Sequence, residues 1–157
     1  MNDDSPIIIV NLKAYEQGYG ANGYDLCKIM EEIALEHKVN LAAAVSPIDL
    51  VDFSDNLDIP IFAQHVDGVN FGSHTGSILP EAVRYSGAVG TLVNHAECQM
   101  SWEEIEKTIN RCKELDLLTV LCTADIASSE KGSHLNPDMI AVEPVSYTHL
   151  RAHETKR

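Results

Sequence analysis

The chain has 157 residues, of which 45% are hydrophobic and 22% are charged, a composition typical of one soluble globular domain. Its 11 basic and 24 acidic residues give a net charge of −13, so it lacks the basic surface that binds nucleic acid or an anionic membrane. The acidic first residues precede an apolar run that is too short for a signal peptide or a membrane span. We therefore expect a cytoplasmic protein.

About six apolar runs along the chain predict β-strands. They are Ile7–Lys13, Leu41–Val45, Ile59–His65, Val89–His95, Leu117–Cys122 and Met139–Glu143. A strand that is buried on both faces needs an unbroken apolar stretch of this kind, and a charged residue at its end is tolerable where it emerges into a cleft.

Helical patterns separate these strands. Residues Tyr24–Lys38 have apolar side chains at helical spacing, namely Leu26, Ile29, Met30 and Ile33. Pro80 suits the first turn of a short helix that Gly87 ends. Ser101 and Glu104 have the form of a capping box, which opens a helix with an inner face made of Ile105, Ile109 and Cys112. The alternation of strands and helices predicts an α/β fold with a parallel sheet and crossover helices.

Polar residues lie at or near the ends of three predicted strands: Asn11, Lys13, His95 and Glu143. Parallel strands of one sheet all finish on the same face, so these side chains should converge on one pocket. For any one position taken alone, a solvated strand end is the alternative interpretation. Their occurrence on three strands favours an active site.

The cysteines and histidines do not indicate a metal centre. Cys27, Cys98, Cys112 and Cys122 form no C-x-x-C pair, so we expect no disulfide and no zinc. Cys27 and Cys112 lie on predicted helix faces and Cys122 ends a predicted strand, which favours free, buried or partly buried thiols. A rim site made of His65, His74, His95 and Glu143 is the alternative, but these residues lack the short spacing of metal ligands on one element. We expect no metal and no other cofactor.

Several segments resemble the shorter, archaeal-type triosephosphate isomerases, and they occur in the order found in that family. They are Val10–Tyr15, Phe62–Asp67, Gly72–Ala82, Gly90–Glu97, Thr119–Thr123 and Ala141–Pro144. The resemblance implies an incomplete (β/α)8 TIM barrel with about six of the eight βα units, formed by residues 1–144. Residues 145–157 hold three of the 11 basic residues and do not match the family, so we expect a foreign or frame-shifted end.

The resemblance also implies an activity, the interconversion of dihydroxyacetone phosphate and glyceraldehyde 3-phosphate in glycolysis and gluconeogenesis. Glu143 would be the base and a neutral His95 the electrophile; these are the established roles in the family and are taken from it. Lys13 and Asn11 would bind the substrate, and Glu97 would hold Lys13. A turn over residues 96–98 would direct its positive end at His95 and disfavour an imidazolium.

The family further implies a homo-oligomer, either a dimer or a tetramer when full length, in which the loop around Thr75 reaches a neighbouring subunit. Two residues depart from its pattern: Ala96 stands where a serine is usual, and Cys98 stands where a basic residue is common. Because the strands whose loops bind the phosphate in the family are missing, we expect the 157-residue chain to be inactive or nearly so.

Two other functions remain open. Lys13 could form a Schiff base in an aldolase-like barrel, with His95 and Glu143 transferring protons. Alternatively, the chain is not an enzyme and co-assembles with an intact barrel through the Gly72–Gly76 loop.

Overall fold

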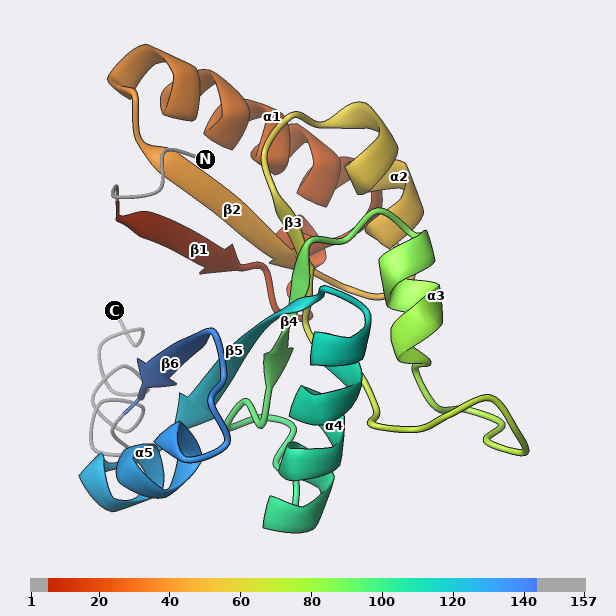
Figure 1. Ribbon diagram of the computed structural model, residues 1–157. Helices are drawn as coiled ribbons and strands as arrows, with labels where there is room; N and C mark the ends of the chain where they lie inside the picture. The colour runs from red at the N-terminus through yellow and green to blue at the C-terminus, as the bar shows by residue number, and fades with distance from the viewer. Residues whose placement is uncertain (1–5, 144–157) are drawn as a thin grey trace.

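The computed structural model describes residues 6–143, which form one parallel sheet of six strands in the order β1-β2-β3-β4-β5-β6. The strands are β1 (Ile7–Asn11), β2 (Asn40–Val45), β3 (Ile61–Ala63), β4 (Gly90–Val93), β5 (Leu118–Thr123) and β6 (Met139–Val142). The sheet curls, and its helices lie along the outside of the curve (Figure 1). The predicted partial barrel is therefore confirmed, whereas the expected non-family segment 145–157 lies outside the described residues.

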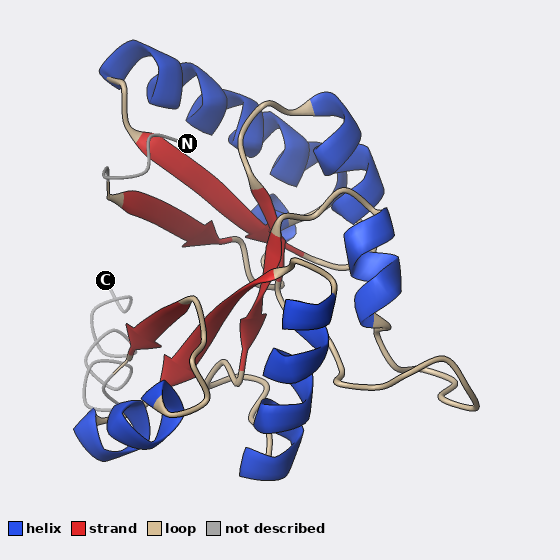
Figure 2. Ribbon diagram, in the orientation of Figure 1, coloured by secondary structure: helices blue, strands red, loops and turns tan. Residues whose placement is uncertain are grey.

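The helices follow the strands in alternation (Figure 2). They are the short 3-10 helix η1 (Glu16–Gly18) and the α-helices α1 (Gly20–His37), α2 (Leu50–Asn56), α3 (Pro80–Tyr85), α4 (Trp102–Glu114) and α5 (Ile126–Ser133). Helices α2 and α5 were not predicted. No helix within residues 6–143 has the length and apolar character needed to cross a bilayer.

Helix α4 begins at the predicted capping box. The Ser101 hydroxyl oxygen accepts the backbone N–H of Glu104, and the Glu104 carboxylate accepts the backbone N–H of Ser101 at 2.7 Å. These bonds pair two donors that the first turn of a helix otherwise leaves free, and such a cap contributes about 1 kcal/mol. The helix buries Ile105, Ile109 and Cys112 against the sheet, as predicted.

Helix α1 differs from its prediction. It starts at Gly20 and buries Gly23, Cys27 and Met30, so Met30 is the only member of the expected apolar face that the helix buries. The other members of that face, Leu26, Ile29 and Ile33, are 36%, 53% and 41% exposed. The spacing correctly predicted a helix. An apolar stripe does not show, however, which of its residues pack against a neighbouring element.

Two apolar layers cover the two faces of the sheet. The outer layer joins alternate strand residues, such as Leu12, Ala43 and Val45, to helix residues such as Cys27 and Phe53. The inner layer contains no helix residue, and Ala42, Ala44, Phe62, Leu92 and Val120 lie at its centre. Successive side chains of a strand point to opposite faces, so this division places Leu12 outside and Asn11 on the inner side.

The two outermost strands expose apolar side chains. Among the described residues, β1 pairs only with β2, and β6 pairs only with β5. Ile8 on β1 is 55% exposed, and Val142 on β6 is 50% exposed. Unpaired backbone groups beside exposed apolar side chains form a template for pairing with another chain.

We expect the purified chain to self-associate through these edges. Ile8→Lys and Val142→Lys should each lower its light scattering severalfold, because a charge on an edge strand disfavours pairing. Leu35→Lys is the matched control, since Leu35 is 83% exposed but lies on α1. A sharp monomer with cooperative melting for the unsubstituted chain would contradict this expectation, as would an equal effect of Leu35→Lys.

Candidate active site

The predicted site residues lie at one end of the sheet, where the carboxyl ends of β1, β4 and β6 meet. Strand β1 ends at Asn11, β4 ends two residues before His95, and β6 ends one residue before Glu143. The strands are thus shorter than predicted, and Lys13, His95 and Glu143 lie on the turns that follow them. Lys13 and His95 lie outside the strand pairings, so their side chains are not held to the alternation of the sheet.

His95 and Glu143 face each other across this rim. The His95 Nε2 atom lies 3.7 Å from a carboxylate oxygen of Glu143. His95 is 8% exposed, whereas the Glu143 side chain is 48% exposed, so the imidazole is fixed and the carboxylate can reach a bound molecule. The Glu143 backbone N–H donates to the Thr123 carbonyl at 2.8 Å, which continues the pairing with β5.

The backbone determines the hydrogen positions on the His95 ring. The backbone N–H of Glu97 donates to His95 Nδ1 at 3.1 Å, so Nδ1 acts as an acceptor and Nε2 carries the hydrogen of a neutral ring. A turn closed by the Cys98 N–H and the His95 carbonyl, at 2.8 Å, holds this donor in place. The structure has a single hydrogen-bonded turn where we predicted a helical turn. One backbone N–H therefore donates to the His95 ring, in place of the positive end of a helical turn.

Lys13 joins the same group of residues. Its ammonium donates to a Glu97 carboxylate oxygen at 3.0 Å, and this hydrogen bond raises the pKa of Lys13 above the ordinary lysine value. The backbone of Lys13 is left-handed, with φ 55°, a conformation unusual for a residue other than glycine. The period-two alternation of side chains along β1 therefore ends before Lys13.

Asn11 and Gln64 hold this left-handed turn. The Asn11 side-chain oxygen accepts the Lys13 backbone N–H at 3.0 Å. The Gln64 side-chain amide donates to the Lys13 carbonyl at 3.0 Å and lies 3.3 Å from the Asn11 oxygen. Gln64 was not predicted as a site residue, although its position directly after an apolar strand is the signal that identified the other rim residues.

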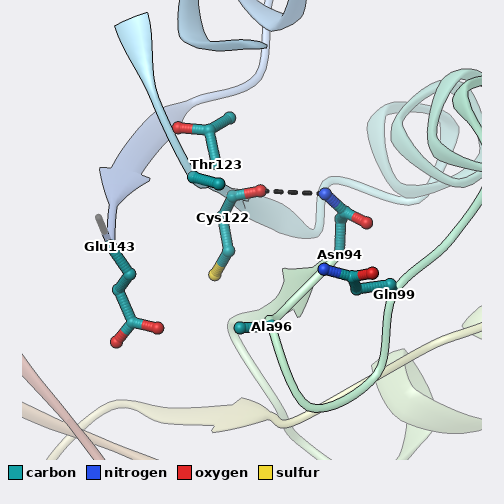
Figure 3. Close-up of a pocket in the computed structure, with 7 residues that line it drawn as sticks. Asn94, Ala96, Gln99, Cys122, Thr123 and Glu143 are labelled. Carbon is teal, nitrogen blue, oxygen red and sulfur yellow. Dashed lines mark hydrogen bonds between the residues drawn. The ribbon is translucent and has the colours of Figure 1, made fainter. Parts of the chain in front are cut away.

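A cavity of about 240 Å³ opens beside Glu143 (Figure 3). Its lining residues are Asn94, Ala96, Gln99, Cys122, Thr123, Ala124 and Glu143. Asn94 is fixed by donating to the Cys122 carbonyl at 3.1 Å and accepting the Met100 N–H at 2.9 Å. Burial raises the pKa of the Cys122 thiol to about 11, so this sulfur is a packing group.

The structure does not bring Thr75 to this rim. Thr75 lies in the exposed loop between β3 and α3, which projects away from the rest of the fold (Figure 1). Of the four cysteines, Cys27, Cys112 and Cys122 are buried and Cys98 is exposed. Burial raises the pKa of Cys27 to about 11 and that of Cys112 to about 12.

Comparison with known proteins identifies the family of this chain. A family model described as triosephosphate isomerase matches residues 6–147. The chain belongs to the triosephosphate isomerase family. It is 44% identical over 141 residues to the triosephosphate isomerase of Methanothermobacter thermautotrophicus and 43% identical over 138 residues to that of Methanocaldococcus jannaschii.

These relatives are longer than this chain. The matches span 90% and 88% of this chain but only 62% and 63% of the two relatives. The crystal structure of triosephosphate isomerase from Bartonella henselae superposes with a TM-score of 0.70, covering 96% of this chain and 77% of that one. At 17% identity, this likeness concerns the fold alone.

We expect Glu97→Gln to lower the pKa of Lys13, because it removes the charge and weakens the hydrogen bond that raise it. An NMR titration of isotopically methylated lysines measures this change. Glu103→Gln is the matched control, because Glu103 raises the pKa of Lys107 in the same way. It should lower the pKa of Lys107 and leave Lys13 unchanged. An unaltered Lys13 titration in Glu97→Gln would contradict the proposed pairing.

Proposed function

We propose that this rim is the proton-transfer site of a triosephosphate isomerase, which interconverts dihydroxyacetone phosphate and glyceraldehyde 3-phosphate through an enediol. The observation that supports this most directly is the hydrogen bond from the Glu97 backbone N–H to His95 Nδ1, which leaves Nε2 facing the Glu143 carboxylate. An aldose–ketose exchange needs a base for the proton next to a carbonyl and a donor for the carbonyl oxygen, and this pair provides both.

Each residue has a separate task in the proposed reaction. The Glu143 carboxylate removes the proton from the carbon beside the carbonyl and returns it to the neighbouring carbon. The Nε2 hydrogen of His95 is donated to the substrate oxygen, where negative charge develops. The Lys13 ammonium stabilises this charge and attracts the substrate phosphate, while Asn11 and Glu97 hold Lys13 in position.

We propose that the 157-residue chain is inactive or nearly so on its own. The family resemblance assigns phosphate binding to loops that follow two further strands, and the matched region covers 62% of the archaeal relative. Binding energy from a remote phosphate orients the substrate and drives closure of the site, so its loss lowers turnover as well as affinity. The proposed substrate is a free sugar phosphate of glycolysis and gluconeogenesis, which leads us to propose a cytoplasmic location.

A chimera tests this function. Residues 1–143 would be joined to the part of the M. thermautotrophicus enzyme beyond the matched region, and turnover would be measured in a coupled isomerase assay. We expect the chimera to be active and at least about tenfold faster than the 157-residue chain, because bound phosphate orients the substrate. Glu143→Gln in the chimera should lower kcat by about 10²- to 10⁴-fold, since it removes the base.

Glu106→Gln is the matched control for this chimera, because Glu106 is exposed on α4, away from the rim, and its replacement should leave turnover unchanged. A folded but inactive chimera would overturn the proposal, and so would full activity in Glu143→Gln.

The environment of Lys13 argues against the aldolase-like alternative. A Schiff base requires a neutral amine, whereas the Glu97 hydrogen bond raises the pKa of Lys13 and keeps it an ammonium. Borohydride trapping with a carbonyl substrate separates the two functions. A covalent adduct on Lys13 would favour the aldolase-like reaction.

We also propose that the loop between β3 and α3 mediates homo-oligomerisation, as the family resemblance implies for Thr75. The loop is exposed, and Phe71 within it is 76% exposed. Gly76 has φ 96°, a conformation that favours glycine and shapes the tip. In the chimera, Phe71→Asp and Thr75→Arg should each reduce the mass measured by light scattering, whereas Leu35→Asp on α1 should not. An unchanged mass in both loop variants would contradict this proposal.

A further inference from the structure

A second, larger cavity lies between the loop after β3 and the start of α4. Its volume is about 710 Å³, and neither Lys13 nor Glu143 lines it. Small-molecule sites in proteins typically have volumes of about 300–1,000 Å³. The residues that line this cavity include His65, Asp67 and Cys98.

These three side chains form a chain of contacts. The Cys98 Sγ atom lies 3.7 Å from His65 Nδ1, and His65 Nε2 lies 3.3 Å from Asp67 Oδ1. An ionised carboxylate can only accept, so Nε2 carries the ring hydrogen and the Nδ1 lone pair faces the sulfur. An activated cysteine consists of a thiol, a base within reach of the thiol and a carboxylate that orients the base.

The backbone holds the cluster in place. The second oxygen of Asp67 accepts the Ile78 N–H at 2.7 Å, and the Asp67 N–H donates to the Ile78 carbonyl at 2.9 Å. The Cys98 N–H closes the turn at His95. Cys98 is exposed, unlike the other three cysteines, which are buried.

We propose that Cys98 is a nucleophilic thiol that reacts with a low-molecular-mass disulfide bound in this cavity. His65 Nδ1 takes the proton from the thiol, and the resulting Cys98 thiolate attacks one sulfur of the disulfide. A new S–S bond forms to Cys98 as the S–S bond of the small molecule breaks. The departing thiolate takes the proton from His65, so one disulfide yields one mixed disulfide on the protein and one free thiol.

The test measures adduct formation on the full chain with 2-hydroxyethyl disulfide, by mass spectrometry of the intact protein and its peptides. We expect the first adduct on Cys98, because burial keeps the other three thiols protonated. His65→Gln should slow the reaction at Cys98 by at least about tenfold, since it removes the base. His37→Gln, at an exposed histidine on α1, is the control and should not slow it.

A second readout separates activation from simple exposure. We compare the rate of adduct formation at Cys98 in the unsubstituted chain and in Asp67→Asn. Between about pH 6 and about pH 8 it should change less in the unsubstituted chain, because the oriented imidazole takes the thiol proton. Circular dichroism verifies that each variant is folded. Equal rates in the unsubstituted chain and a folded His65→Gln would overturn the proposal. A first adduct on Cys27, Cys112 or Cys122 would also overturn it.

Discussion

Parallel pairing of the strands is the constraint on which the rest of the structure depends. All six described strands run in one direction, so the turns after β1, β4 and β6 meet at one rim although their residues are far apart in sequence. At this rim Lys13 contacts Glu97 at 3.0 Å, and His95 Nε2 lies 3.7 Å from Glu143. The same topology leaves β1 and β6 as apolar edge strands. The parallel sheet that brings the site residues together can therefore also pair with another chain.

Glu97 connects the groups at this rim. Its backbone N–H defines the neutral form of His95, and its carboxylate holds the Lys13 ammonium. The contact with His95 uses the Glu97 backbone and needs only the fold of the turn. The contact with Lys13 needs the charge of the Glu97 carboxylate. A substitution of the Glu97 side chain therefore separates them. Asn11 and Gln64 complete the arrangement by holding the left-handed turn that directs Lys13 inward.

Much of this arrangement could be predicted from the sequence, because it follows from local patterns. Apolar runs gave the six strands, and the Ser101–Glu104 capping box gave the start of α4. Helices α2 and α5 were missed because they are short and have few apolar residues at helical spacing. The conformation of Lys13 depends on the amide of Gln64, which donates to its carbonyl from 51 residues away, and Gln64 also donates to Ala44 on β2. No local pattern contains these contacts. The interface at Thr75 stays a prediction from the family.

The most direct test of the proposed site is the hydrogen position on the His95 ring, measured by NMR of the ¹⁵N-histidine-labelled chain at neutral pH and assigned with His95→Gln. We predict a neutral ring with the hydrogen on Nε2 and an Nδ1 that accepts a hydrogen bond. A ring with the hydrogen on Nδ1, or with hydrogens on both nitrogens, would contradict the proposed contact with Glu97 and the proton transfer that depends on it.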